Sequence, residues 1–551
     1  MLKIILKKIK YSKFLNNIMQ KNKYWLFLSI IILVSVSINL FWVFNYSNPF
    51  NFEDMIQLQS TVILINKDNG EILLDSSLNK ISGSNIDFYD FYYSKIQPLI
   101  PSLYYVGLKL FWHPFTPLIV NIFFSIILII TTFLISNHIY DKNVAILSSV
   151  MVAFSQSLLA HQRTTYDAYI LIVLFNINLL FFIKSNHLRN TFWSILWGIS
   201  SSFCLLARYS QLAYISSILI YFFYFILKNK KINVSQIINI SCCILIIMCL
   251  VLPHYVHESN INNYINRSKN KNTIFPKNIA NIIENFYFYI NHIVVFQLGL
   301  FYSIIFVISL LKKISLKSLK QYEIFFVLIL LQIFSFFSII PIRNVSVTSL
   351  TIPLFIIFVS GSTLLIKNRI VKKIIIAIII LNILLTILPF GIPKTMIFNK
   401  NHHIGDSNNL LNYINKDFTS YQIISDLIKN KDFKIIRILD ITHRFHNEIR
   451  YYSLFIDNDK KIILEDGKDI FKHKKIENIS KTLLNYNVIL ISNLEFNASI
   501  YDISSKDKIN KLKEMINFIK NSNEFQQFKS YRIKNDPNLK YILVYTRNLE
   551  K

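Results

Sequence analysis

The sequence predicts a polytopic α-helical membrane protein followed by a small α/β domain outside the membrane. Apolar stretches long enough to cross a bilayer as helices recur over the first 393 residues, and we count about 11 such spans. Lysines and arginines are concentrated in alternate connections between these stretches. Beyond residue 393 the apolar runs shorten, and acidic and basic residues mix.

The predicted spans start with a retained signal anchor. The first 24 residues carry lysines and no acid, and the apolar run after them lacks the small-residue cleavage site of a removable signal peptide. We therefore expect a cytoplasmic basic N-terminus over 1–24 and a transmembrane domain over 25–393, with long outside loops at 45–117 and 255–285. The spans are predicted at 25–44, 118–137, 144–160, 167–183, 191–207, 211–227, 236–254, 286–311, 324–341, 347–366 and 373–391.

Positive charge sets the predicted orientation. With the N-terminus inside, most lysines and arginines of the membrane part fall on inside segments, and the short outside connections carry one arginine each, at Arg163, Arg208 and Arg343. This is the positive-inside pattern, and it places residues 394–551 outside the membrane. The inside segments are 1–24, 138–143, 184–190, 228–235, 312–323 and 367–372.

Composition argues against several functional classes. A net charge of +28 would suggest nucleic acid as a partner of a soluble protein, but here much of the charge orients helices, so we expect no nucleic-acid partner. All four cysteines lie inside predicted spans, which argues against redox chemistry and thiolate metal sites. The nine glycines form no glycine-rich phosphate loop, and the histidines show no metal-ligand spacing.

Several segments outside the predicted spans have patterns that indicate their structure. Residues 96–112 mix aromatic and aliphatic side chains, which is typical of a helix lying in the membrane interface. The loop 255–285 is polar and rich in asparagine, and it is a candidate lid. Strand-like and helical patterns alternate over 394–551 and predict an α/β domain. The clearest strands are predicted at 433–440, 487–492 and 541–545, and the clearest helix at 505–521.

Glu53 and Asp54 are candidates for a catalytic base. They follow the first predicted span on the outside. A carboxylate held at the membrane surface can take a proton from a hydroxyl while that hydroxyl attacks an anomeric carbon. The alternative is that the pair starts a helix, where acidic side chains complement the helix dipole.

Asp167 is a second candidate acid. It begins the fourth predicted span, on a short outside turn that also carries Arg163. We expect it to lie across a cavity from Asp54, where it either orders an acceptor or contributes to a site for a divalent cation. The alternative is that it caps the helix or forms an ion pair with Arg163.

Arg208 and Arg343 are candidates for binding a phosphate. They end the fifth and ninth predicted spans on the outside, where the positive-inside rule disfavours arginine. A lipid phosphate would explain them, because a guanidinium group binds phosphate through paired hydrogen bonds. The alternative is an arginine that snorkels to the interface. Arg163 and Lys95 are the next candidates for the phosphate.

Four features follow one another along the chain. They are an acidic pair in the first outside loop, a Pro-x-x-Pro-x-Leu-Tyr-Tyr segment at 98–105, an acid at the start of the fourth span, and Arg343 before a span that contains Pro353. This order resembles the GT-C membrane glycosyltransferases, in particular the branch with protein O-mannosyltransferases and the lipid A aminoarabinose transferase. Many members are also similar in having an outside α/β tail. The resemblance covers nearly the whole chain, with short motifs.

The resemblance implies a polyprenyl-phosphate-linked sugar as donor, an acceptor on the outer face and inverting transfer. It matches Asp54 or Glu53 to the family's first-loop catalytic acid and Asp167 to its second acid. The family more often has Asp-Glu where this chain has Glu53-Asp54, and often His where this chain has Gln97, so the base stays open between two adjacent residues. Members differ in their use of metal, and a divalent cation stays open as well.

These observations favour an inverting glycosyltransferase of the inner (plasma) membrane, with Asp54 as base and Arg208 and Arg343 on the departing lipid phosphate. Its expected partners are the polyprenyl-phosphate sugar, a glycan, lipid or protein acceptor, and membrane lipids. One alternative is a flippase or other transporter of polysaccharides or lipid-linked sugars, which would need broken helices or repeats with polar groups at mid-membrane. Another is a non-catalytic scaffold whose outer domain binds a partner.

Overall fold

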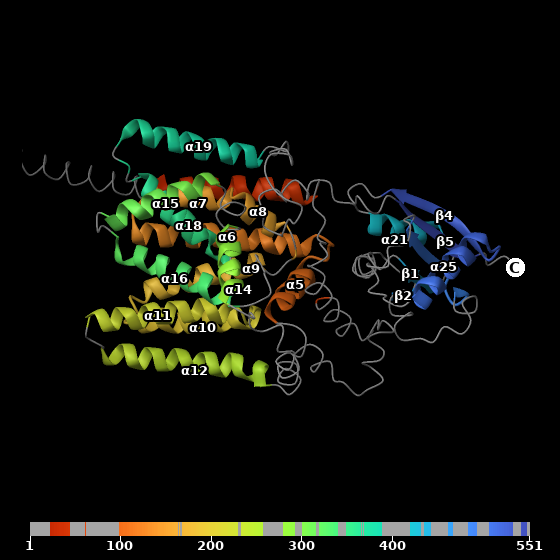
Figure 1. The fold of residues 1–551 in the computed structure, drawn as a ribbon, viewed down its shortest axis with the longest axis horizontal. Helices are drawn as coiled ribbons and strands as arrows, with labels where there is room; N and C mark the ends of the chain where they lie inside the picture. Colours follow the sequence, from red (N-terminus) through yellow and green to blue (C-terminus); the bar gives the residue numbers. More distant parts are fainter. Residues whose placement is uncertain are drawn as a thin grey trace, which may run out of the picture. The chain divides into compact units, whose positions relative to one another are not determined.

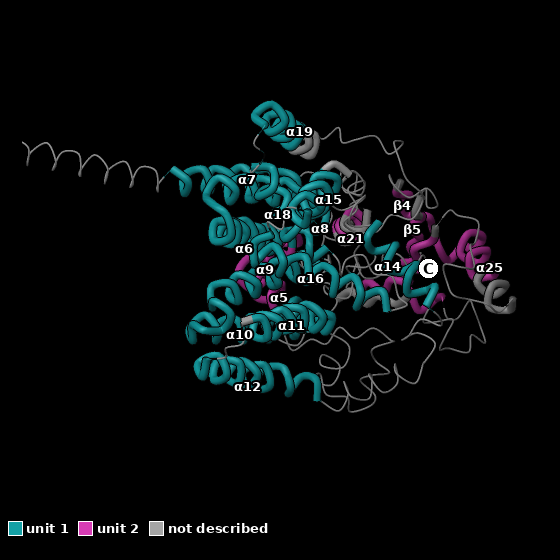
Figure 2. The backbone as a smooth tube through the Cα atoms, turned by 60° about the vertical axis from the view of Figure 1, so that its left-hand side comes forward, with its two compact units in different colours: residues 1–47, 93–100, 118–414 teal, residues 48–92, 101–117, 415–551 magenta. Residues whose placement is uncertain are grey.

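The chain forms two compact units in a computed structural model (Figure 2). The first unit contains residues 1–47, 93–100 and 118–414, and the second contains 48–92, 101–117 and 415–551. The structure describes residues 23–44, 61, 98–163, 165, 168–229, 233–256, 279–291, 300–315, 319–339, 349–364, 366, 368–387, 419–430, 435–441, 461–466, 483–492, 506–532 and 541–547. Most of the predicted outside loops 45–117 and 255–285 lies outside these ranges.

The described part of the first unit is helical, because its apolar stretches have the length and composition of helices that pack in a membrane. The long helices α10, α11 and α12 lie side by side (Figure 1). The helices are an N-terminal helix (Lys23–Phe44), α6 (Thr116–Ile139), α7 (Lys142–Ala153), α8 (Gln156–Gln162), α9 (Ala168–Lys184), α10 (Thr191–Ala207), α11 (Gln211–Asn229), α12 (Val234–Val256), α14 (Ile279–Asn291), α15 (Leu300–Ser315), α16 (Gln321–Ser338), η4 (Ser349–Thr351), α18 (Ile352–Leu364) and α19 (Arg369–Ile387).

Every predicted span overlaps one or two of these helices, although few of the helices could cross a membrane alone. Among the described residues, the helices with sufficient length and apolar character are Lys23–Phe44, Thr116–Ile139, Gln211–Lys228, Val234–Val256 and Gln321–Ser338. The pair α7 and α8, which is bent by 53°, would add one more span. The span predicted at 286–311 corresponds to α14 and α15, with 292–299 outside the described residues. About 11 crossings therefore stays a prediction.

Buried polar contacts join two of the predicted inside segments, 138–143 and 312–323. The Tyr140 hydroxyl donates to Oε1 of the fully buried Glu323 over 2.5 Å, and Lys313 pairs with the same carboxylate. The backbone N–H of Lys320 donates to Glu323 Oε2 over 2.9 Å. Gly361 of α18 leaves room for the Tyr140 ring, since a Cβ at this position would lie 2.5 Å from it. Helices α6, α15, α16 and α18 therefore meet at one end of the first unit.

The turn between α9 and α10 lies at the same end of the first unit as these contacts. Its residues 186–188 all have left-handed backbone conformations, with φ of 50°, 59° and 61°, which side chains other than glycine adopt at a cost. Gln236 and Asn239 of α12 donate to two carbonyls of this turn, each over 2.8 Å. The His187 ring stacks on Phe225 with centroids 3.8 Å apart. Burial, and secondly the charge of Arg189, lowers the pKa of His187 to about 4, so the stacked ring is neutral at neutral pH.

The described part of the second unit is built around a mixed five-stranded sheet in the order β2-β1-β3-β5-β4. Strand β1 pairs in parallel with β2 and β3, whereas β5 is antiparallel to β3 and β4. Met515 and Ile519 of α25 pack into its core with Leu439 and Ile489. The elements are α5 (Leu99–Leu110), most of which belongs to this unit, α21 (Thr419–Asn430), β1 (Ile435–Asp440), β2 (Lys461–Asp466), β3 (Val488–Ser492), α25 (Lys506–Asn521), β4 (Phe525–Arg532) and β5 (Tyr541–Arg547).

Several of the C-terminal elements occur where the sequence patterns predict them, whereas α21, β2 and β4 were not predicted. Strands β1, β3 and β5 correspond to the predicted strands, α25 to the predicted helix, and α5 to the predicted helix at 96–112. Lys529 and Tyr531 of β4 donate to Asp426 of α21 over 2.6 and 2.8 Å. Burial alone would raise the pKa of Asp426, but these hydrogen bonds and the nearby lysine charges outweigh it and lower that pKa. The location of this unit outside the membrane stays a prediction.

The buried Lys313–Glu323 pair makes a testable prediction about stability. Glu323→Gln keeps the size of the side chain but removes its charge. Because the Lys313 side chain is only 13% exposed, loss of its counter-charge should lower the free energy of unfolding by about 3 kcal/mol. Thermal unfolding of the detergent-solubilised protein measures this. Adding Lys313→Met should recover part of the loss, and an unchanged midpoint in the single variant would contradict the prediction.

Candidate functional site

The structure describes two of the predicted site residues, Arg163 and Arg208. Both are arginines assigned to short outside connections. The candidate acids and the remaining candidate cations, Glu53, Asp54, Lys95, Asp167 and Arg343, lie outside the described residues. Their roles therefore stay predictions, and the site is built here from the two arginines and the side chains around them.

A break in one predicted span positions Arg163. Helix α7 ends at Ala153, and Phe154 and Ser155 separate it from α8. Helix α8 is a short segment of which Ser157 to Gln162 are buried, and Arg163 follows directly as its C-cap. The backbone N–H of Arg163 donates to the Leu159 carbonyl over 3.1 Å. The bend thus places an arginine at the end of a buried helix rather than on its surface.

The Arg163 side chain is almost completely buried, with 2% of its surface exposed. Its guanidinium carbon lies 4.4 Å from the centre of the Trp42 ring, a cation–π distance. Nη2 donates a long hydrogen bond of 3.4 Å to Asn39 Oδ1. Asn39 is oriented by its own Nδ2, which donates to the Ser35 carbonyl over 2.9 Å. Two side chains of the N-terminal helix, Asn39 and Trp42, thus contact the guanidinium, and the Ser35 carbonyl orients the first of them.

Two nitrogens of the Arg163 guanidinium, Nε and Nη1, have no hydrogen-bond partner in the described part of the chain. Burying a charge costs free energy unless it is paired, and a ring face and one long hydrogen bond compensate only part of this cost. Nitrogens in this state are suited to the oxygens of a phosphate or carboxylate, which guanidinium groups bind through charge-assisted hydrogen bonds. Arg163 is therefore a candidate for binding an anion.

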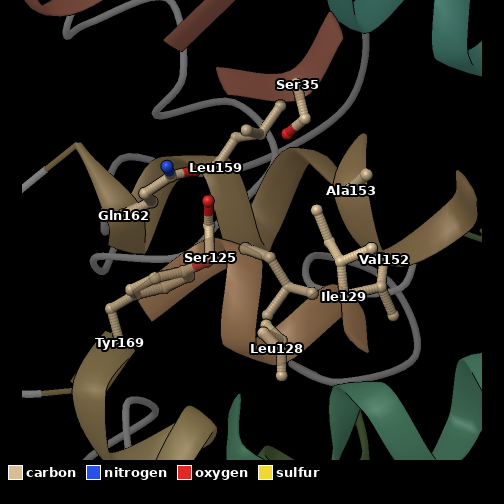
Figure 3. A pocket seen from close by; sticks show the side chains of 10 residues that line it. Ser35, Ser125, Leu128, Ile129, Val152, Ala153, Leu159, Gln162 and Tyr169 are labelled. Carbon is tan, nitrogen blue, oxygen red and sulfur yellow. The ribbon is translucent and has the colours of Figure 1, made fainter. Parts of the chain in front are cut away.

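Gln162 contributes a second polar group at the same point of α8. Its carbonyl accepts a hydrogen bond from Asn121 Nδ2 of α6 over 3.1 Å, whereas its side-chain Nε2 has no partner among the described residues. The side chain borders a small pocket together with Ser125 and Tyr169 (Figure 3). The pocket is lined by Ser35, Ser125, Leu128, Ile129, Val152, Ala153, Leu158, Leu159, Gln162 and Tyr169.

Arg208 occupies a different position, at the turn between α10 and α11. It is the C-cap of α10 with an extended backbone, and its N–H donates to the Cys204 carbonyl over 3.0 Å. Its own carbonyl accepts from the N–H of Gln211, which starts α11. The side chain is partly buried, and its charge acts on the fully buried Tyr214. A half-buried arginine at a predicted outside turn is consistent with both hypotheses for Arg208, phosphate binding and snorkelling to the interface.

The sequence pattern indicated Arg163 as a candidate, but it did not indicate the side chains that contact Arg163. Asn39 and Trp42 lie in the first predicted span, and a polar Asn within an apolar run was the available signal, since polar groups in spans commonly serve a site. Gln162 and Gln211 gave no such signal, because each lies at the edge of a span where polar residues are ordinary. Among the described residues, no group of three or more His, Cys, Asp or Glu could hold a metal ion.

Comparisons with known proteins find similarity in structure but not in sequence. No protein-family model matches the sequence, and no curated protein matches it. ArnT from Cupriavidus metallidurans in the apo state is similar, with a TM-score of 0.59 and 9% identity, over 95% of this chain and 98% of ArnT. The structure of the same protein bound to undecaprenyl phosphate gives a TM-score of 0.58 and 8% identity over the same shares.

A third similar structure is the arabinofuranosyltransferase AftD from mycobacteria, with a TM-score of 0.50 and 10% identity, over 95% of this chain and 40% of AftD. At these identities the likeness concerns the fold. It extends over nearly the whole length of this chain, as the resemblance in sequence motifs does. The chain therefore has the fold of the GT-C membrane glycosyltransferases.

Proposed function

We propose that the protein is an inverting glycosyltransferase that moves a sugar from a polyprenyl-phosphate donor to an acceptor hydroxyl on the outer face of the membrane. The observation that carries the proposal is the buried guanidinium of Arg163, with two nitrogens left without a partner in the described part of the chain. ArnT, which has a similar fold, has been solved with undecaprenyl phosphate bound. A lipid phosphate supplies the oxygens that such a guanidinium needs.

The proposed reaction needs a base and a group that stabilises the leaving phosphate. Asp54, or its neighbour Glu53, takes the proton of the acceptor hydroxyl as that oxygen forms a bond to the sugar C1. The bond between C1 and the phosphate oxygen breaks on the opposite face, and the lipid phosphate leaves with the electron pair. Arg163 and Arg208 stabilise its charge.

Further residues have narrower proposed roles. Arg343 and Lys95 are additional candidates for the phosphate. Asp167 orders the acceptor or contributes to a divalent-cation site. The acceptor is a glycan, lipid or protein, and its class is open.

We place the protein in the inner (plasma) membrane, with a cytoplasmic N-terminus and residues 394–551 outside. The positive-inside pattern supports this orientation. Contacts of 138–143 with 312–323, and of the 184–190 turn with Gln321, support a common end for these segments, as the pattern requires. A transporter is the other reading to test, because the bent pair α7 and α8 is one feature that transporters share.

Arg163 makes the first prediction about function. Replacing it with Gln should weaken use of the lipid-linked donor by the value of a charged hydrogen bond, about 1.5–3 kcal/mol or roughly ten- to a hundredfold. Arg163→Lys should recover only part, because an ammonium group cannot form the paired contact. Transfer from radiolabelled polyprenyl-phosphate sugars at subsaturating donor measures the effect. Arg189→Gln is the matched control, since Arg189 also lies over an aromatic ring, Phe225, but is exposed.

Stability separates this role from a structural one. A guanidinium kept for a ligand is unsatisfied in the free protein, so Arg163→Gln should leave the thermal midpoint unchanged or raise it. An arginine that forms an ion pair within the chain should lose stability on the same replacement. A clear loss of stability together with normal donor use would contradict the proposed phosphate contact.

The acidic pair makes the second prediction. Asp54→Asn preserves size and removes the proton acceptor, so transfer should fall by about a hundredfold or more while the protein still inserts. Glu53→Gln should have a smaller effect. A larger loss at Glu53 would move the base to that residue, and full activity of both variants would exclude the pair from proton transfer.

Orientation can be tested independently of activity. A reporter that is active only in the periplasm should be active when fused after residue 395 and inactive when fused after Lys230. The reason is that 228–235 carries the positive charge of an inside segment, whereas an odd number of crossings leaves 394–551 outside. The reverse pattern would place the candidate acids on the wrong side of the membrane for the proposed chemistry.

A further inference from the structure

Gln211 is a buried side chain whose amide the described part of the chain leaves without a partner. It is the first residue of α11 and is 0% exposed. Its backbone N–H donates to the Arg208 carbonyl over 3.0 Å, but neither Nε2 nor Oε1 of its side chain has a partner in the described part of the chain. A buried amide left in this state costs free energy, and such groups call for a specific reason.

Other buried amides of the first unit show how this fold normally satisfies them. Nε2 of Gln236 donates to the His187 carbonyl over 2.8 Å, while its Oε1 accepts from the N–H of Asn233. Nδ2 of Asn178 donates to Ser200 and Ser201, and its Oδ1 accepts from the Trp197 indole. Gln211 is buried as completely, but neither its Nε2 nor its Oε1 has such a partner in the described part of the chain.

The neighbours of Gln211 point to the ligand. Arg208 precedes it by three residues across the turn between α10 and α11, and Tyr214 follows on the same face of α11. Tyr214 is fully buried and packs on Phe175 of α9 and Phe337 of α16, with ring centroids 4.9 and 6.0 Å away. Gln211 therefore lies between a cation and a packed aromatic face. The hydrogen bond from the Gln211 N–H to the Arg208 carbonyl keeps the two residues in one turn, so a phosphate bound at Arg208 would hold its attached sugar near Gln211.

We infer that Gln211 recognises the sugar of the donor through hydrogen bonds. Its Oε1 accepts a hydrogen bond from one ring hydroxyl and its Nε2 donates to an adjacent one, while Arg208 binds the phosphate that the sugar is attached to. An amide carries one acceptor and one donor group side by side, which matches a pair of neighbouring hydroxyls. A site with a polar group aimed at a substrate hydroxyl discriminates strongly against a substrate that lacks it. This inference rests on the proposed function and adds a residue that selects the sugar.

The test compares donors that differ by one hydroxyl. The wild-type protein is first assayed with a panel of polyprenyl-phosphate hexoses. The hexose that it transfers is then compared with its singly deoxygenated analogues through kcat/KM. Gln211→Met removes the amide at similar size, and should lower kcat/KM for the full sugar by about ten- to a hundredfold. It should leave the analogues that lack the recognised hydroxyls nearly unaffected, so that the preference of the wild type for the full sugar disappears at those positions.

Binding of undecaprenyl phosphate, which has no sugar, provides the second measurement. It should be unchanged in Gln211→Met and weakened in Arg208→Gln, and unchanged binding also shows that the variant is folded. Gln236→Met is the matched control, since it removes a buried amide whose partners are in the protein. It should lower stability without changing the preference among deoxygenated sugars. Gln211→Glu keeps an acceptor but loses the donor, and it provides a second variant for the same comparison if Gln211→Met misfolds.

Failure of the inference and failure of the proposed function give different results. If the wild type transfers a sugar and Gln211→Met retains the full preference for every hydroxyl, other residues recognise the sugar and the inference is wrong. If Gln211→Met instead weakens undecaprenyl phosphate binding, the residue acts on the phosphate and the inference is also wrong. If the wild type neither binds the lipid phosphate nor transfers any sugar of the panel, the proposed function itself is overturned, and the inference with it.

Discussion

The contact between the Arg163 guanidinium and the Trp42 ring lies where the elements that form the candidate site meet. It requires the N-terminal helix to present Asn39 and Trp42 on one face, and it requires the break before α8 to deliver an arginine to that face. Asn121 of α6 fixes the end of α8 through the Gln162 carbonyl. A cation held in this way is positioned before any ligand arrives, which reduces the entropy lost on binding an anion.

Buried amide and charged side chains fall into two sets in the described part of the first unit. Those near the connections assigned to the inside, such as Glu323 and Gln236, are satisfied within the protein. The amide and guanidinium groups with unpartnered atoms are Gln162, Arg163 and Gln211, all beside connections assigned to the outside. Proteins accept unsatisfied polar groups where function needs them and satisfy them elsewhere. This contrast is the physical reason to look for the reaction at the outside connections.

Local pattern predicted much of the fold because the apolar stretches and the strands are local features. The spans at 191–207 and 211–227 coincide with α10 and α11 almost residue by residue. The segments 138–143 and 312–323, which the charge pattern assigns to one side of the membrane, are in contact. The 53° bend within 144–160 and the left-handed turn at 186–188 had no signal, because neither contains a glycine or proline and both depend on contacts with distant helices. Arg163 was a candidate from the sequence, but its burial against Trp42 is a tertiary contact that periodicity does not reveal.

The binding of the lipid phosphate by Arg163 can be tested with a structure of the protein in complex with undecaprenyl phosphate, determined by cryo-electron microscopy. We expect phosphate oxygens within hydrogen-bonding distance, about 2.7–2.9 Å, of Nε or Nη1 of Arg163, with the Trp42 contact preserved. The contradictory result is a phosphate bound away from Arg163, with the guanidinium paired instead to a carboxylate of its own chain.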